Sequence, residues 1–322
     1  MIIDYSRELI KVSGSNHPLN EMMDDSLTEK QCDDIMNMMR YCLENNDFEM
    51  FKNSEYYTES YMCEGVIGDF FIKQLIKLME VFCKNKYKLS VSKYYSASKE
   101  INDIYTKVSY LLQHDKVARF KHRNDLVNIT TKSTVMVDKT DGTIYNIQEA
   151  ELFYSTTGIK DMVDAAMNSI KDDCTKEQGE ALRKNADAVV YNTNLSFAQK
   201  YGYVDSCTVE ADGTTYNNVK LEDCIMYFKD AVARYYNNIA VVNYDISDQV
   251  RYIKFLENMY NTYTRNYGNN ADCKYYIDEV FKCVIDNMTK SMEFNNSIVE
   301  TQIECIKYSS DQLHKIYNTL KK

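Results

Sequence analysis

The chain has 322 residues, of which 44% are hydrophobic, so it is long enough to bury a sizeable core and too apolar for wholesale disorder. Its net charge of −10 disfavours general binding to nucleic acid or to anionic membrane surfaces. The single proline is Pro18, and because proline is the strongest helix breaker, its absence from the rest of the chain permits long helices.

The charge is unevenly distributed along the chain. Residues 1–60 carry 13 acidic and 5 basic side chains, a net charge of −8, whereas residues 61–126 carry 7 acidic and 12 basic side chains, a net charge of +5. Residues 127–322 carry the remaining −7. Such alternation suits docking between copies of a chain or between its segments, and it also arises by chance on solvated helices.

The amino-terminal part is predicted to comprise an extension, residues 1–25, and a helical region, residues 26–126. Ser26 and Glu29 form the pattern of a capping box, in which each side chain satisfies a backbone N–H of the other residue. Apolar residues then repeat at helical spacing as far as Leu43, so we expect the first helix here.

Two further helices are predicted in the same region. The first covers residues 58–84, and its wide apolar face indicates burial on most sides. The second covers residues 98–120.

The periodicity changes in a mixed region, residues 127–225. Two segments rich in β-branched residues, 134–147 and 207–219, each contain an Asp-Gly pair, which is a strong signal for a β-hairpin turn. The pairs are Asp141-Gly142 and Asp212-Gly213. We therefore expect two hairpins.

The two hairpin segments share the sequence Asp-Gly-Thr-x-Tyr-Asn, at residues 141–146 and 212–217. Three interpretations stay open: a duplicated hairpin-plus-helix unit, two hairpins that pair in one small sheet, and chance similarity. Between them a helix is predicted over residues 175–201, ended by Gly202, because glycine readily adopts a left-handed cap.

The carboxyl-terminal region, residues 226–322, is predicted to be helical. Helices are expected near residues 221–238 and 246–267, the latter ended by Gly268, and a long amphipathic helix is expected from about residue 273 to the end. The fold class is therefore mainly α, an elongated helical bundle with a small β part in the middle.

The last helix has a seven-residue apolar repeat, the spacing that keeps one seam facing a partner helix. The repeat comprises Ile285, Met292, Val299, Ile306, Leu313 and Leu320. The alternating seam positions include three polar residues, Asn295, Gln302 and Ser309, which weaken a purely hydrophobic zipper. One interpretation is a coiled-coil seam used in assembly; the other is an amphipathic helix packed against its own chain.

The only dense basic cluster lies between residues 114 and 123. Its members are His114, Lys116, Arg119, Lys121 and Arg123. One hypothesis is a docking patch for an anion, either a phosphate or the acidic amino-terminal region of another copy. The alternative is a helix carboxyl terminus whose cations complement the helix dipole.

Catalytic and metal-binding motifs are not found in the sequence. The four histidines lack zinc-site spacing, the ten cysteines form no Cys-x-x-Cys pair, and the nine glycines form no phosphate-binding loop. The Asp-Gly segments lack the carboxylates of a calcium loop. We therefore expect no enzyme, no cofactor and no metal. Scattered cysteines within helical patterns favour a reducing compartment, so we expect a cytoplasmic protein or one incorporated into an assembly.

The leading hypothesis is a non-enzymatic structural protein that associates with itself or with other assembly proteins through helical arms. A virion component fits, and the abundance of tyrosine, 28 residues, is typical of an AT-rich genome. No nucleic acid partner and no membrane span are expected. The alternatives are a helical enzyme or anion-binding protein that uses residues 114–123, and a secreted helical effector or pore-forming toxin.

Overall fold

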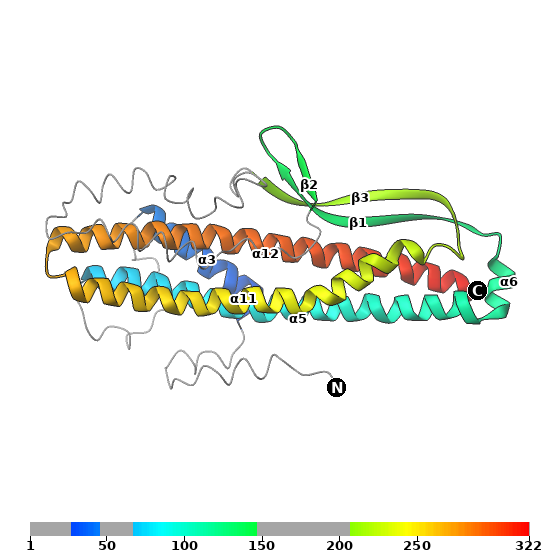
Figure 1. The fold of residues 1–322 in the computed structure, drawn as a ribbon, viewed down its shortest axis with the longest axis horizontal. Coiled ribbons are helices and arrows are strands. Elements are labelled where there is room, and N and C mark those ends of the chain that lie inside the picture. Colours follow the sequence, from blue (N-terminus) through cyan, green and yellow to red (C-terminus); the bar gives the residue numbers. More distant parts are fainter. Residues whose placement is uncertain (1–26, 46–66, 147–206, 322) are drawn as a thin grey trace. The chain divides into compact units, whose positions relative to one another are not determined.

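The computed structural model describes residues 27–45, 67–146 and 207–321 and shows a mostly helical protein with a small antiparallel sheet (Figure 1). The elements are α3 (Glu29–Asn45), α5 (Ile67–His114), α6 (Lys116–His122), β1 (Leu126–Asp138), β2 (Ile144–Asn146), β3 (Cys207–Lys220), α11 (Met226–Tyr267) and α12 (Ala271–Lys321). The chain divides into two compact units, Met1–Leu89 and Ser90–Lys322. The predicted extension, residues 1–25, and the predicted helix over residues 175–201 lie outside the described residues.

A capping box opens α3, two residues later than the sequence pattern suggested. The Thr28 backbone N–H donates to Gln31 Oε1 at 2.9 Å, and the Gln31 backbone N–H donates to Thr28 Oγ1 at 3.3 Å. This reciprocal pair satisfies two backbone donors that the first turn of a helix leaves open. Ser26 lies outside the described residues, and Glu29 is the first residue of the helix.

Both described helices of the first unit bury apolar side chains at helical spacing. The buried residues of α3 are Cys32, Ile35, Met36, Met38, Met39 and Cys42, and those of α5 in this unit are Ile72, Leu75, Ile76, Leu78, Met79, Phe82 and Cys83. The Leu27 N–H donates to Asn85 Oδ1 at 3.4 Å. Lys86 Nζ lies 3.8 Å from a Glu29 carboxylate oxygen and 3.5 Å from one of Asp33.

The second and third predicted helices are one continuous helix, α5. The prediction of a break between residues 84 and 98 was wrong, because this stretch contains no glycine or proline to stop a helix. The break comes instead at Asp115. Its Oδ1 accepts hydrogen bonds from the backbone N–H groups of Val117 (2.9 Å) and Ala118 (3.0 Å), which caps a new helix, α6.

The sheet has three antiparallel strands in the order β2-β1-β3. The long strand β1 pairs with β3 from Leu126↔Lys220 to Asp138↔Cys207, and with β2 from Val135↔Asn146 to Val137↔Ile144. The two segments with the shared motif therefore pair in one sheet. The register shifts after Val127, which is consistent with a bulge in the strand pair.

The two Asp-Gly pairs adopt different structures. Asp141-Gly142 lies in the connection between β1 and β2, where Gly142 has φ of 73°. Hydrogen bonds from the Thr143 side chain and backbone lower the pKa of Asp141. Asp212-Gly213 instead lies inside β3, opposite Ser133 and Lys132, so the second predicted turn was wrong. Pairing along the whole of β1 overrides the local turn signal. Gly213 fits this strand because its φ is not positive, unlike that of Gly142.

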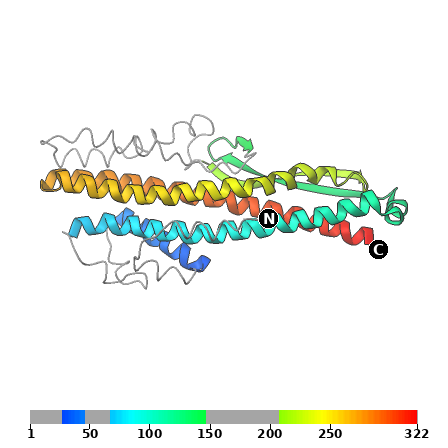
Figure 2. The ribbon, with the colours of Figure 1, turned by 60° about the horizontal axis from the view of Figure 1, so that its bottom comes forward.

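The two carboxyl-terminal helices lie side by side and antiparallel (Figures 1 and 2). The predicted helices 221–238 and 246–267 are a single helix, α11, because nothing between them breaks a helix. As predicted, α11 ends at Gly268, whose N–H donates to Thr264 O at 2.8 Å. Asn270 Oδ1 then accepts from the N–H of Asp272 (2.9 Å) and caps α12.

Within the second unit, α12 contacts the sheet, α11 and the later part of α5. Lys132 Nζ of β1 lies 4.5 Å from the centre of the Tyr308 ring on α12, a cation–π contact. On α5, Ser90 Oγ is 3.3 Å from Asn296 Oδ1, and Glu100 accepts from Ser310 Oγ at 3.2 Å. These contacts place α12 in the interior of this unit.

Candidate docking surface

The heptad seam of α12 is buried within the chain. All six of its apolar residues, Ile285, Met292, Val299, Ile306, Leu313 and Leu320, are at most 5% exposed. The polar seam residues Asn295, Gln302 and Ser309 are buried as well. This burial leaves the seam no exposed face in this conformation.

The basic cluster lies where the chain turns from α5 through α6 into β1. His114 is the last residue of α5 and its ring is 5.3 Å from that of Tyr110. Lys116, Arg119 and Lys121 are in α6, and Arg123 directly follows it. All five members of the cluster are exposed. The structure thus brings them together, because the capped break at Asp115 gathers consecutive residues on a short separate helix.

Two large apolar side chains lie among these cations. Val117 is 77% exposed and Phe120 is 73% exposed, and they are three residues apart, so they share one face of α6. The guanidinium of Arg123 lies 5.2 Å from the centre of the Phe120 ring. Leu126, at the start of β1, is 58% exposed. Lys116, Val117, Arg119, Phe120, Lys121 and Arg123 are called the α6 surface below.

The opposite face of α6 anchors it to the rest of the second unit. Ala118 and His122 are buried, and they are four residues apart. His122 Nδ1 is hydrogen-bonded to Asp125 Oδ2 at 2.7 Å. The backbone oxygen of Asp125 accepts from the N–H of Leu221, which follows β3, at 2.9 Å. The exposed face of α6 is therefore held in a defined orientation.

The local charge of the α6 surface is positive. Within residues 115–125 the four cations face two acids, Asp115 and Asp125. Both acids already accept hydrogen bonds, Asp115 as the helix cap and Asp125 in its contact with His122. The outward face therefore presents cations around an apolar centre, a composition that is enriched at protein interfaces. The sequence pattern revealed the cations but not the apolar residues, whose exposure depends on the helix break at Asp115.

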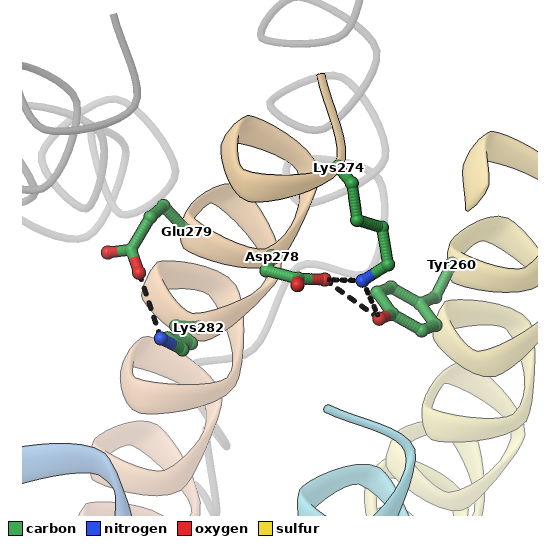
Figure 3. Close-up of polar contacts among 5 residues, drawn as sticks. All are labelled: Tyr260, Lys274, Asp278, Glu279 and Lys282. Carbon is green, nitrogen blue, oxygen red and sulfur yellow. Dashed lines mark hydrogen bonds and ion pairs between the residues drawn. The ribbon is translucent and has the colours of Figure 1, made fainter. Parts of the chain in front are cut away.

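A polar cluster that the sequence did not reveal joins α11 to α12 (Figure 3). The buried Tyr260 donates its hydroxyl to Asp278 Oδ1 at 2.8 Å and accepts from Lys274 Nζ at 2.9 Å. Lys274 and Asp278 form an ion pair, four residues apart on α12. The next residue along α12, the buried Glu279, accepts from Lys282 Nζ at 2.8 Å. Figure 3 shows Tyr260, Lys274 and Asp278 directed at one another, which is the arrangement of a structural tie between neighbouring helices, and the Glu279–Lys282 pair apart from them on α12.

Three of the buried cysteines, Cys32, Cys83 and Cys224, are poor nucleophiles. Burial raises the pKa of Cys83 and of Cys224 to about 12 and that of Cys32 to about 11. A thiol with so high a pKa stays protonated at neutral pH and does not react. Cys273 is disulfide-bonded, a bond that the spacing of the cysteines did not predict.

Within the described ranges, no group of three or more His, Cys, Asp or Glu side chains is arranged to hold a metal ion. No helix of the described part combines the length and the apolar character needed to cross a membrane. Comparison of the chain with protein-family models, with curated proteins and with solved structures gives no match. Function therefore has to be argued from the α6 surface itself.

Proposed function

We propose that this chain is a non-enzymatic assembly protein that docks onto an acidic protein surface through the α6 surface. The observation that carries the proposal is the exposure of Val117 and Phe120 among four exposed cations on a helix that is anchored from behind. Fully burying a valine or phenylalanine stabilises a complex by about 1.5–3 kcal/mol each. The surrounding cations supply attraction and orientation toward a partner of opposite charge.

The α6 surface is preferred over the α12 seam for physical reasons. Exposing the seam would require buried residues such as Ile306 and Leu313 to leave the interior of the chain. Val117 and Phe120 need no such rearrangement. The helical arms in this proposal therefore serve as a scaffold that presents the α6 surface.

The composition of the surface also separates a protein partner from a phosphate or a membrane. A phosphate is bound by cations and backbone N–H groups, and two exposed apolar side chains make no favourable contact with it. A lipid surface would accept both kinds of side chain, but the net charge of −10 repels anionic headgroups. An acidic polypeptide with apolar or aromatic residues matches the cations and the apolar centre together.

The proposal is tested with the full chain and three probes: the acidic copolymer poly(Glu,Tyr), inorganic tripolyphosphate, and vesicles that contain phosphatidylserine. We expect binding of poly(Glu,Tyr) that weakens at least about tenfold when Val117 and Phe120 are both replaced by serine, because interface anchors of this kind dominate affinity. A matched control is Phe255→Ser, which alters an exposed phenylalanine on α11.

The control should bind poly(Glu,Tyr) as the unaltered chain does. Equal binding by the chain with and without Val117 and Phe120 would refute the proposal. Binding of tripolyphosphate alone would instead support the anion-binding alternative, and binding of vesicles alone would support docking to a lipid surface; either result would refute an acidic protein partner.

A further inference from the structure

We infer that the partner of the α6 surface is helix α3 of a second copy of this chain. This inference rests on the proposed function and names the partner that the proposed function leaves open. It is based on the composition of the one described amino-terminal helix and on charge complementarity between two parts of the same molecule.

The amino-terminal region carries the opposite charge to the α6 surface. Residues 1–60 have 13 acidic and 5 basic side chains, a net charge of −8. Within this region α3 is described, and its four acids, Glu29, Asp33, Asp34 and Glu44, outnumber its two cations, Lys30 and Arg40, which gives a net charge of −2.

The outward face of α3 combines acids with an aromatic ring. Lys30, Asp34, Asn37, Tyr41 and Glu44 are spaced by four, three, four and three residues, so they form one stripe along the helix. All five are exposed, and Tyr41 is 39% exposed. This set of residues is called the α3 stripe.

The α3 stripe and the α6 surface are complementary in composition. Along the stripe Tyr41 lies between the acids Asp34 and Glu44, while in the α6 surface Phe120 follows Arg119 and its ring lies 5.2 Å from the Arg123 guanidinium. Arginine pairs well with carboxylates and also stacks on aromatic rings, so one stripe offers both kinds of contact. The contact would bury Phe120 and Tyr41, the residue types that most often anchor interfaces.

The two surfaces differ, and this determines the type of assembly. A contact between unlike surfaces is head-to-tail, and it leaves one unused α6 surface and one unused α3 stripe after each addition. Copies can therefore add to both ends. The expected product is a series of growing oligomers whose size rises with protein concentration and falls with added salt, which screens the exposed charges.

The test exchanges the charges of the two surfaces in the full chain. The first variant carries Arg119→Glu and Arg123→Glu; the second carries Asp34→Lys and Glu44→Lys; the third carries all four changes. Light scattering after size-exclusion chromatography gives the mass of each at low salt. All four positions are exposed, and circular dichroism checks that each variant is folded.

We expect the unaltered chain to form oligomers, and each two-site variant to dissociate at least about tenfold more readily because like charges then face each other. The four-site variant should regain association, and an equimolar mixture of the two two-site variants should associate as well. A control with Lys307→Glu and Lys315→Glu, two exposed positions of α12, should behave as the unaltered chain.

The other outcomes separate this inference from the proposed function. If the variant at Asp34 and Glu44 forms oligomers as the unaltered chain does while the variant at Arg119 and Arg123 does not, the α6 surface docks elsewhere: the inference is overturned and the proposed function stands. If the variant at Arg119 and Arg123 also associates as the unaltered chain does, the α6 surface does not mediate self-association. The inference is then overturned, and so is the proposed function where the partner is a second copy. A chain that stays monomeric at every concentration at low salt overturns the inference, and the poly(Glu,Tyr) measurement then decides the proposed function.

Discussion

Replacing Gln302 by leucine is expected to stabilise the folded chain, because Gln302 is a polar residue in a buried heptad seam. Gln302 is 3% exposed, and its Oε1 atom is buried without a hydrogen-bond partner among the described residues. A buried polar group without a partner costs about 1–3 kcal/mol of folding free energy. Leucine removes that cost and adds buried apolar surface next to Ile306 and other seam residues.

The expected gain in the free energy of unfolding is about 1–3 kcal/mol, which corresponds to a rise in melting temperature of several degrees for a domain of this size. The assay is urea or thermal denaturation followed by circular dichroism. The matched control is Lys307→Leu, an exposed position of the same helix, where the change should stay within about 0.5 kcal/mol.

The Gln302→Leu result also distinguishes the two interpretations of the seam. A seam packed within the chain predicts a gain in stability that is independent of protein concentration. A seam between copies predicts a melting temperature that rises with concentration. A fall in stability on Gln302→Leu, or a gain that appears only at high concentration, would refute burial of the seam within one chain.

Three further predictions follow from the fold. Gly213→Val should raise the free energy of unfolding by up to about 1 kcal/mol, because this glycine lies in a strand. Gly142→Val should lower it by about 1–2 kcal/mol, because valine resists a positive φ. Denaturation curves of the two variants measure both changes. Tyr260→Phe should lower the free energy of unfolding by about 1.5–3 kcal/mol, since the hydroxyl bonds two charged groups, and an unchanged denaturation midpoint would contradict the tie between α11 and α12. Burial raises the folded-state pKa of the Cys83 and Cys224 thiols from an ordinary 9.0 to about 12. Their contribution to stability is therefore complete below pH 9 and is lost as the pH rises from about 9 to 12, because the thiols ionise first in the unfolded chain. The free energy of unfolding measured across this range should fall less when both residues are replaced by alanine.

The sequence predicted the helices well where the signal was local. Apolar residues at helical spacing located α3 and α12, and Gly268 marked the end of α11. Helix breaks were predicted less well. Separate helices were predicted on either side of residues 84–98 and 238–246. A helix without glycine or proline has no local reason to stop, and α5 and α11 continue through both stretches.

The sheet and the α6 surface depend on interactions that are remote in sequence. Asp212-Gly213 has the local signal of a turn, yet its structure is set by pairing with β1, about eighty residues earlier. Val117 and Phe120 have apolar side chains that a helical pattern would assign to the interior. Their exposure follows from the cap at Asp115, which starts a new helix and directs Ala118 and His122 inward instead.

The most direct test of self-association through the α6 surface is the solution mass of three proteins at low salt: the unaltered chain, Phe120→Ser and Phe255→Ser. The unaltered chain and Phe255→Ser are expected to exceed the monomer mass of 37.7 kDa increasingly as concentration rises, while Phe120→Ser remains close to it. A Phe120→Ser protein that associates as strongly as the unaltered chain, or an unaltered chain that remains at the monomer mass throughout, would contradict self-association through this surface.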